Sequence, residues 1–249
     1  MIYSLTKTAT DERGDARLAR EAKWLRELEG VRPMQGQVPR LLDEGTTAQG
    51  RRYLVVSVTP AEGETRAFTH DHARFLATLG RARFKVADFE MSGCFEHLQR
   101  ALEVSPDPLL EEATAECEAA LLYWTGPYVL SQGDFAPWNI RMLGSQLFVY
   151  EWGDARGEAS PLDDVLHYIM IQRALRQRPI TAAFLQSAMK HAQEFAVQAY
   201  PEWSWRPQVI GALTLAYLVG AVLHGGDASR SYRRLIQNRS SWLRQGDMS

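Results

Sequence analysis

The sequence is poor in cysteine and has almost no net charge. Its two cysteines, Cys94 and Cys117, lie far apart and form no CxxC motif, and its six histidines show no HExxH spacing. A disulfide framework, a structural zinc site and a transition-metal site are therefore not expected, and both thiols are predicted to be buried in a reducing cytosol. The formal net charge of −2 creates no long-range field, so we expect neither a nucleic-acid partner nor a membrane partner.

The sequence also lacks an apolar run long enough to cross a membrane. Its N-terminus, MIYSLTKTATDERGD, contains no apolar signal core, so secretion is not expected and a cytoplasmic location is predicted. The uncharged stretch Val209–Leu223 has 15 residues, whereas a membrane-spanning helix needs about 20. We therefore predict that this stretch is a buried core helix.

The N-terminal part of the sequence predicts a small β-rich unit with one helix. Ile2–Thr8 has the alternation of a strand, and Asp15–Glu29 has apolar residues at helical spacing. Val38–Thr47 and Arg51–Val58 are separated by a turn-forming segment and predict a β-hairpin. The apolar stripe of the helix consists of Leu18, Ala22, Leu25 and Leu28.

After a short polar break at Pro60–Gly63, the sequence is mostly helical around a central β segment. We place a boundary at this break, which gives an N-terminal lobe at residues 1–62 and a C-terminal lobe at residues 63–249. Because strands and helices are grouped rather than alternating, the predicted fold class is α+β. The predicted elements of the second lobe are helices at Thr69–Ala82, Ser92–Val104 and Pro108–Trp124, strands at Tyr128–Leu130, Ile140–Leu143 and Gln146–Glu151, and helices at Pro161–Leu175, Ile180–Tyr200, Pro207–His224 and Ser229–Arg244.

The segment Leu130–Asn139, LSQGDFAPWN, contains the most informative spacing in the chain. Asp134 and Asn139 have the D-x-x-x-x-N spacing of a kinase catalytic loop. An acceptor hydroxyl needs a carboxylate that takes its proton and aligns it with the γ-phosphorus, and an amide oxygen five positions later can ligate magnesium. The alternative is that both side chains only stabilise a turn.

A second carboxylate follows the loop at the end of an apolar strand. Ile140–Leu143, the turn at Gly144 and Ser145, and Leu147–Trp152 predict a hairpin whose return strand delivers Glu151. A protein kinase has a hairpin at the same place, which ends in an aspartate that holds magnesium. Glu151 is therefore a candidate for a second magnesium ligand.

Together these features resemble the aminoglycoside phosphotransferase and choline kinase family. GDFAPWN, an apolar strand, a Glu-Trp pair and PLDDVLHY are similar to the family pattern H-G-D-x-x-x-x-N, D-W or D-x-G, and P-x-x-D. The resemblance covers most of the chain and implies a protein-kinase-like two-lobe fold, with a β-rich nucleotide-binding N-terminal lobe and a mainly helical C-terminal lobe. It implies Asp134 as catalytic base, with Asn139 and Glu151 as ligands of Mg²⁺ bound with ATP or GTP. Asp164 is implied as a structural acid near a helix start, where it satisfies free N–H groups.

The N-terminal lobe offers an independent check of this resemblance. A kinase-like fold needs an early lysine for the α- and β-phosphates and a glutamate from the next helix that holds it. Lys7 lies on the first predicted strand, and Glu21 falls on the apolar stripe of the first helix, where a carboxylate must find a partner. We predict that they pair, and the alternative is a snorkelling pair at the surface. The resemblance also implies that backbone groups near Ser57 and Val58 face the adenine.

Three features differ from the family pattern. The sequence begins at the lysine strand, so we expect a truncated N-terminal lobe without the first two strands and the glycine-rich loop. Gln132 replaces the usual histidine, and Glu151 replaces the usual aspartate. The extra methylene of glutamate displaces the carboxylate, and a displacement of about 1 Å can lower a rate about 10²-fold.

These differences leave two functions open. The first is an ATP-dependent phosphotransferase acting on a hydroxyl of a small metabolite, such as an amino sugar, an amino alcohol or a sugar-like compound. The second is a catalytically degenerate relative that binds a nucleotide or a protein partner without turnover. A helical protein-interaction module, in which GDFAPWN is coincidental, is a third interpretation from another class.

No motif identifies the acceptor or the oligomeric state. Glu151–Asp164 contains five acids against one base, Arg156, and this excess would attract a cationic acceptor. The alternative is a solvated loop with an acidic helix start. The expected absence of two strands would leave an exposed sheet edge, from which we predict a homodimer through the small lobe.

Overall fold

The structure is a computed structural model that describes residues 3–59, 67–144 and 146–243. The chain divides into two compact units: unit 1 consists of Met1–Ala82 and Gln132–Arg156, and unit 2 of Arg83–Ser131 and Gly157–Ser249. This grouping differs from the predicted division into residues 1–62 and 63–249, because Gln132–Arg156 groups with the N-terminal elements. The predicted boundary at Pro60–Gly63 itself lies outside the described residues.

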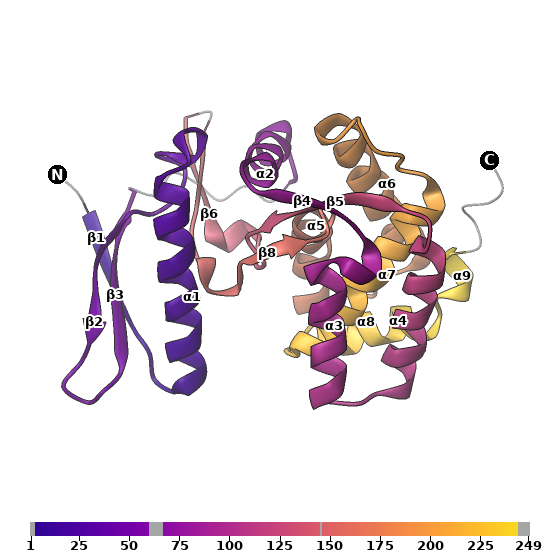
Figure 1. The fold of residues 1–249 in the computed structure, drawn as a ribbon, viewed down its shortest axis with the longest axis horizontal. Coiled ribbons are helices and arrows are strands. Elements are labelled where there is room, and N and C mark those ends of the chain that lie inside the picture. Colours follow the sequence, from indigo (N-terminus) through magenta and orange to yellow (C-terminus); the bar gives the residue numbers. More distant parts are fainter. Residues whose placement is uncertain (1–2, 60–66, 145, 244–249) are drawn as a thin grey trace. The chain divides into compact units, whose positions relative to one another are not determined.

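Unit 1 contains a three-stranded antiparallel sheet, a long helix and a separate hairpin (Figure 1). The sheet order is β1-β3-β2, and its register places Lys7 opposite Leu54. The predicted strand at residues 2–8 and the predicted first hairpin are therefore confirmed over the described residues. The elements of unit 1 are β1 (Tyr3–Thr8), α1 (Glu12–Glu29), β2 (Leu41–Thr46), β3 (Arg52–Val58), α2 (His70–Ala82), β6 (Ile140–Leu143) and β7 (Gln146–Val149).

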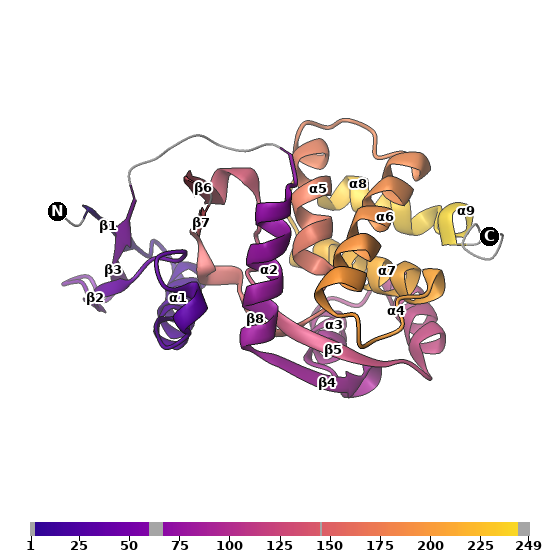
Figure 2. The same ribbon diagram turned by 90° about the horizontal axis from the view of Figure 1, so that it is seen from above.

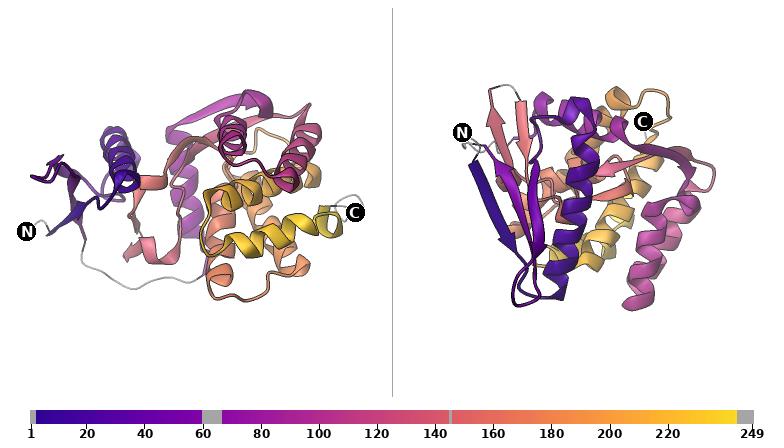
Figure 3. Two further views of the ribbon diagram at one scale, coloured as in Figure 1. Left: turned by 90° about the horizontal axis from the view of Figure 1, so that it is seen from below. Right: turned by 60° about the vertical axis from the view of Figure 1, so that its left-hand side comes forward.

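Helix α1 packs beside the sheet (Figure 3, right) because its apolar stripe is buried. The side chain of Asp11 accepts a hydrogen bond from the Gly14 amide, which satisfies one of the free N–H groups at the helix start. The four residues predicted as its stripe are all buried, and so is Glu21, which is 1% exposed. The helix therefore carries a buried carboxylate on the face that packs into unit 1.

Helix α2 supports the segment at residues 132–139 from within unit 1. It contacts β7, and its Phe75 ring stacks on Phe135 with the ring centroids 5.8 Å apart. Both rings are buried, as are Leu147 and Val149 of β7. This apolar contact anchors the residue that follows Asp134, so the loop rests on a packed base.

Unit 2 combines the helices α3 to α9 with a small sheet in the order β4-β5-β8 (Figure 2). The predicted helices are present with boundary differences of a few residues, whereas the short strands β4 and β8 were not predicted. Their sequences, FKVAD and RGEA, are too short and too mixed in polarity to show alternation. The elements are β4 (Phe84–Asp88), α3 (Gly93–Val104), α4 (Pro108–Leu121), β5 (Thr125–Ser131), β8 (Arg156–Ala159, from its second residue), α5 (Asp163–Leu175), α6 (Ala182–Ala199), α7 (Pro207–His224), α8 (Ser229–Gln237) and α9 (Ser240–Leu243).

The most apolar helix, α7, is the central helix of unit 2. Over the described residues it is the one helix long and apolar enough to cross a membrane by length and composition. Every residue from Val209 to Val219 is buried, and α7 contacts α3, α4, α6 and α8; Figure 3 (left) shows α8 running along it. The prediction of a buried core helix is therefore confirmed.

The predicted last helix, Ser229–Arg244, is interrupted. Helix α8 ends at Gln237, where the amide of Asn238 bonds back to three carbonyls, and α9 begins at Ser240. Its predicted last residue, Arg244, lies outside the described residues. The two cysteines are free and buried, as predicted.

Candidate active site

The predicted catalytic base and the predicted magnesium-ligating amide are in direct contact. The Asn139 side-chain nitrogen donates to the Asp134 carboxylate oxygen Oδ2 at 2.8 Å and to the Asp134 carbonyl at 2.9 Å. Asn139 is buried and lies in a 3₁₀ turn at Pro137–Asn139, which starts β6. This contact fixes the rotation of the Asp134 carboxylate and directs the opposite end of the Asn139 amide, Oδ1, away from it.

Gly133 makes this loop conformation possible. Its φ angle is +85°, and a Cβ atom placed there would lie 2.1 Å from the carbonyl oxygen of Asp154. The backbone of the loop therefore approaches the Asp154 backbone more closely than any side chain permits. This close approach explains why the GDFAPWN motif has a glycine at this position.

We expect Gly133→Ala to destabilise unit 1 by on the order of 2 to 4 kcal/mol, combining left-handed strain with overpacking against backbone. The matched control is Gly50→Ala, because Gly50 has a similar φ of +77° with nothing within 4 Å. Gly50→Ala should cost only about 1 kcal/mol. Urea denaturation measures the free energy of unfolding of both variants, and equal losses of this free energy would contradict the steric explanation.

Gln132 joins the loop to the end of the return strand. Its side-chain oxygen accepts from the Asp134 amide at 2.9 Å, and its side-chain nitrogen donates to the carbonyls of Tyr150 and Glu151 at 2.9 and 2.6 Å. Gln132 is fully buried. The residue at the usual histidine position therefore links Asp134 to Glu151.

Lys7 forms ion pairs with two carboxylates. Its ammonium lies 2.8 and 3.0 Å from the two carboxylate oxygens of Glu21 and 2.7 Å from Oε1 of Glu151. The side chains of Lys7 and Glu21 are 13% and 2% exposed, whereas that of Glu151 is 40% exposed. The predicted pairing of Lys7 with Glu21 is present and mostly buried, so it is not a snorkelling surface pair.

Burial dominates the electrostatics of Glu21. Removal from water raises the pKa of its carboxyl above the usual value, and the neighbouring Lys7 opposes this rise. The nearby Glu151 carboxylate raises the pKa further. Glu21 therefore depends on Lys7 to remain charged inside unit 1.

Three α1 residues that were not predicted hold the segment after Glu151. Arg17 donates to the Asp154 carboxylate at 2.7 Å, Arg20 donates to the Gly153 carbonyl at 2.8 Å, and the indole of Trp24 donates to the Ala155 carbonyl at 3.0 Å. The three residues recur at i, i+3 and i+7 and so share one helix face. The sequence shows this spacing, although it does not show that the shared face contacts the segment after Glu151.

Ser57 and Val58 lie in β3, away from these contacts. The Ser57 amide donates to the Arg40 carbonyl at 2.9 Å, and its hydroxyl accepts from the Arg40 amide. Val58 is opposite Tyr3 in the sheet. The next residue, Thr59, donates its amide to the Tyr150 hydroxyl at 3.1 Å. Contact of the Ser57–Val58 backbone with adenine stays a prediction, and the Ser57 amide would have to exchange its present partner to take part.

The residues present fit a magnesium ion delivered with a nucleotide. No group of three or more His, Cys, Asp or Glu side chains that could hold a metal occurs in the described part of the chain. The predicted pair offers Oδ1 of Asn139 and Oε2 of Glu151, neither of which accepts a hydrogen bond from a described residue. Magnesium is commonly held by one or two protein oxygens together with substrate phosphates and water.

The acids of Glu151–Asp164 do not form an open acidic patch. Glu151 pairs with Lys7, Asp154 with Arg17, and Glu158 with Lys85 at 3.0 Å. The other two acids, Asp163 and Asp164, are buried, and Asp164 accepts a hydrogen bond from the Ser131 hydroxyl at 2.9 Å in the first turn of α5. This segment gives no support to recognition of a cationic acceptor by excess negative charge.

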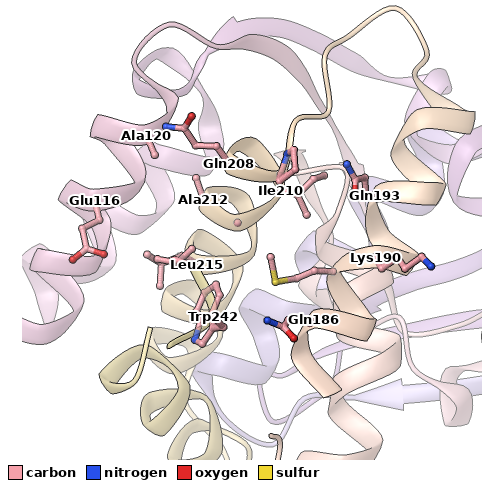
Figure 4. Close-up of a pocket in the computed structure, with 14 residues that line it drawn as sticks. Glu116, Ala120, Gln186, Lys190, Gln193, Gln208, Ile210, Ala212, Leu215 and Trp242 are labelled. Atoms are coloured by element: carbon pink, nitrogen blue, oxygen red, sulfur yellow. The ribbon is translucent and has the colours of Figure 1, made fainter. Parts of the chain in front are cut away.

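Unit 2 contains a separate pocket of about 620 Å³ (Figure 4). It is lined by residues of α4, α6, α7 and α9, including Gln186, Lys190, Gln208 and Leu215. None of the predicted site residues lines it. The pocket therefore carries none of the phosphoryl-transfer chemistry described above.

No family model and no curated protein matches this sequence. Solved structures do match. The GDP complex of aminoglycoside 2′-phosphotransferase-IIIa aligns over 96% of this chain and 86% of that chain, with a TM-score of 0.56 and 15% identity. The complex of a thermostable APH(4)-Ia mutant with ADP and hygromycin B covers 94% and 84%, with a TM-score of 0.54 and 12% identity. The gentamicin complex of APH(2″)-IIa covers 97% and 85%, with a TM-score of 0.52 and 16% identity.

The chain has the aminoglycoside phosphotransferase fold. The predicted α+β, protein-kinase-like class is therefore confirmed, and so is the resemblance at the level of the fold. A kinase-like fold has a lysine on an early strand and a glutamate on the helix that follows, which agrees with Lys7 in β1 and Glu21 in α1. At these sequence identities the activity is a matter for proposal.

Proposed function

We propose that the chain is an ATP- or GTP-dependent phosphotransferase that uses Mg²⁺ and acts on a hydroxyl of a small metabolite. The observation that carries this proposal is the connected set of hydrogen bonds from Asn139 and Asp134 through Gln132 to Glu151, and from there to Lys7 and Glu21. A turn-stabilising role for Asp134 and Asn139 alone requires none of the last three residues. Lysine, glutamate, aspartate and asparagine are the residue types that phosphoryl transfer needs.

Each residue has a role that follows from its surroundings. Lys7, held by Glu21, neutralises phosphate charge, and Asp134, with its rotation fixed by Asn139, accepts the proton of the acceptor hydroxyl. Asn139 and Glu151 supply oxygen ligands for magnesium, which when bound offsets the charge of the phosphates. Catalysis by such a site is mainly positioning, which the buried contacts of Gln132 and Glu21 support.

The acceptor class rests on proteins of the same fold. Structures of the same fold contain gentamicin, hygromycin B with ADP, or kanamycin with GDP. We therefore propose an amino sugar, an amino alcohol or a sugar-like compound as acceptor, and a purine nucleotide as donor. A cytoplasmic location, where ATP is plentiful, and a homodimer through the exposed edge strand β1 stay predictions.

The proposal is tested by nucleotide titration followed by an acceptor screen. We expect ATP or GTP with Mg²⁺ to raise the melting temperature, because a ligand at 100 times its Kd stabilises the native state by about 2.7 kcal/mol. EDTA should reduce the shift. ADP or GDP release is then measured with kanamycin, gentamicin, hygromycin B and choline as acceptors.

The outcomes separate the three interpretations. Nucleotide binding with acceptor-dependent turnover supports the phosphotransferase. Nucleotide binding without turnover on a broad panel of hydroxylated amines and sugars indicates the degenerate binder. No binding of ATP or GTP, with or without Mg²⁺, would contradict the phosphotransferase and the nucleotide-binding relative, and would favour a protein-binding relative or the interaction module.

A further inference from the structure

Glu151 has an unusual backbone conformation for its residue type. Its φ and ψ angles are 58° and 67°, which lie in the left-handed region, and in the described part of the chain only Gln177 is a second non-glycine residue with positive φ. A non-glycine residue there costs about 1–2 kcal/mol. Such a conformation persists only when the surroundings determine it, and it is common at functional sites.

The buried side chain of Gln132 determines this conformation. Its amide nitrogen has two hydrogens, and they are donated to the Tyr150 and Glu151 carbonyls. The Tyr150 carbonyl belongs to the peptide plane before the Glu151 Cα, and the Glu151 carbonyl belongs to the plane after it. The orientations of these two planes define φ and ψ of Glu151, so one amide group holds both angles.

The same side chain ties this geometry to the catalytic loop. The Gln132 oxygen accepts from the Asp134 amide, so the direction of the Glu151 Cα–Cβ bond is fixed relative to Asp134. From this position the Glu151 carboxylate reaches Lys7 at 2.7 Å. We infer that Gln132 is a positioning residue that sets the direction of the Glu151 carboxylate and thereby the magnesium dependence of nucleotide binding.

This inference rests on the proposed function and concerns a residue where the family pattern has histidine. A neutral histidine has one N–H donor, so it can hold one of the two peptide planes while accepting from the Asp134 amide. Leucine has neither donor nor acceptor. The magnesium dependence of nucleotide binding should therefore be strongest in the wild type, weaker in Gln132→His and weakest in Gln132→Leu.

The test is the ratio of ATP dissociation constants without and with Mg²⁺, measured by calorimetry. We expect Gln132→Leu to reduce this ratio by about 10- to 100-fold, as loss of an outer-shell partner does at metal sites. The affinity for ATP in EDTA should be unchanged. Gln132→His should give an intermediate ratio, and it decides the question if the leucine variant does not fold.

The matched control is Trp24→Phe, which removes the donor to the Ala155 carbonyl in the same segment and leaves Glu151 untouched. Its ratio should equal that of the wild type even though the variant is less stable. The inference is overturned if both Gln132 variants keep the wild-type ratio, or if Trp24→Phe lowers the ratio equally. If the wild-type protein binds GTP rather than ATP, the same ratio is measured with GTP; a wild-type protein that binds neither nucleotide overturns the proposed function and this inference with it.

Discussion

Asp134→Asn is expected to lower the rate of phosphoryl transfer by a factor of about 10² to 10⁴, the usual contribution of a general base. Asparagine keeps the size of the side chain and an oxygen that can accept from the Asn139 amide, so the loop should remain folded. It cannot accept the proton of the acceptor hydroxyl. Nucleotide affinity in the presence of Mg²⁺ should be unchanged, because the proposed phosphate and metal contacts come from other residues.

Steady-state kinetics and calorimetry measure the two quantities separately. The control is Asp43→Asn in β2, which removes a carboxylate of unit 1 that accepts hydrogen bonds from the Tyr53 hydroxyl at 3.1 Å and the Glu44 amide at 2.9 Å. It should leave turnover near the wild-type value. An Asp134→Asn variant with the wild-type rate would remove Asp134 from the proton-transfer role.

Lys7→Met is expected to destabilise the protein by about 3–5 kcal/mol, the range found when one partner of a buried ion pair is removed. The reason is Glu21, whose side chain is 2% exposed and would be left without a cation beside it. Burial already raises the pKa of Glu21 while Lys7 is present, so the loss of Lys7 would drive this carboxyl toward the neutral form. Binding of ATP with Mg²⁺ should also be lost.

A double variant separates the structural part of this effect from the functional part. Lys7→Met combined with Glu21→Leu leaves no buried charge without a partner, because the Glu151 side chain is 40% exposed. Buried ion pairs replaced by apolar residues are commonly neutral or stabilising. Urea denaturation should therefore show recovered stability, while nucleotide binding stays lost. A single Lys7→Met loss below about 1 kcal/mol, typical of an exposed pair, would contradict the buried pair.

The sequence was informative wherever a pattern is local. The stripe of α1 places Glu21 among buried residues by helical spacing alone, and a buried carboxylate has few alternatives to a nearby lysine. The spacing of Asp134 and Asn139 corresponds to a direct contact because both lie in one short loop. The hairpin that delivers Glu151 follows from a turn between two apolar strands.

Contacts between distant segments and unusual backbone angles could not be predicted from the sequence. Nothing in the residue type of Glu151 indicates a left-handed conformation, since that conformation depends on Gln132, 19 residues earlier. The acids of Glu151–Asp164 suggested an open patch because their cationic partners, such as Arg17 and Lys85, are far away in the chain. Short strands such as β4 gain their structure from pairing with β5 rather than from their own pattern.

Helix α1 makes these separate contacts interdependent. One face of it holds Lys7 through Glu21, and the same helix holds residues 153–155 through Arg17, Arg20 and Trp24. A slide of α1 by a single residue, about 1.5 Å along its axis, would break the lysine contact and the anchors beside Glu151 together. Under the proposed function, a displacement of α1 would therefore loosen the phosphate-binding lysine and the segment after the magnesium-binding carboxylate at the same time.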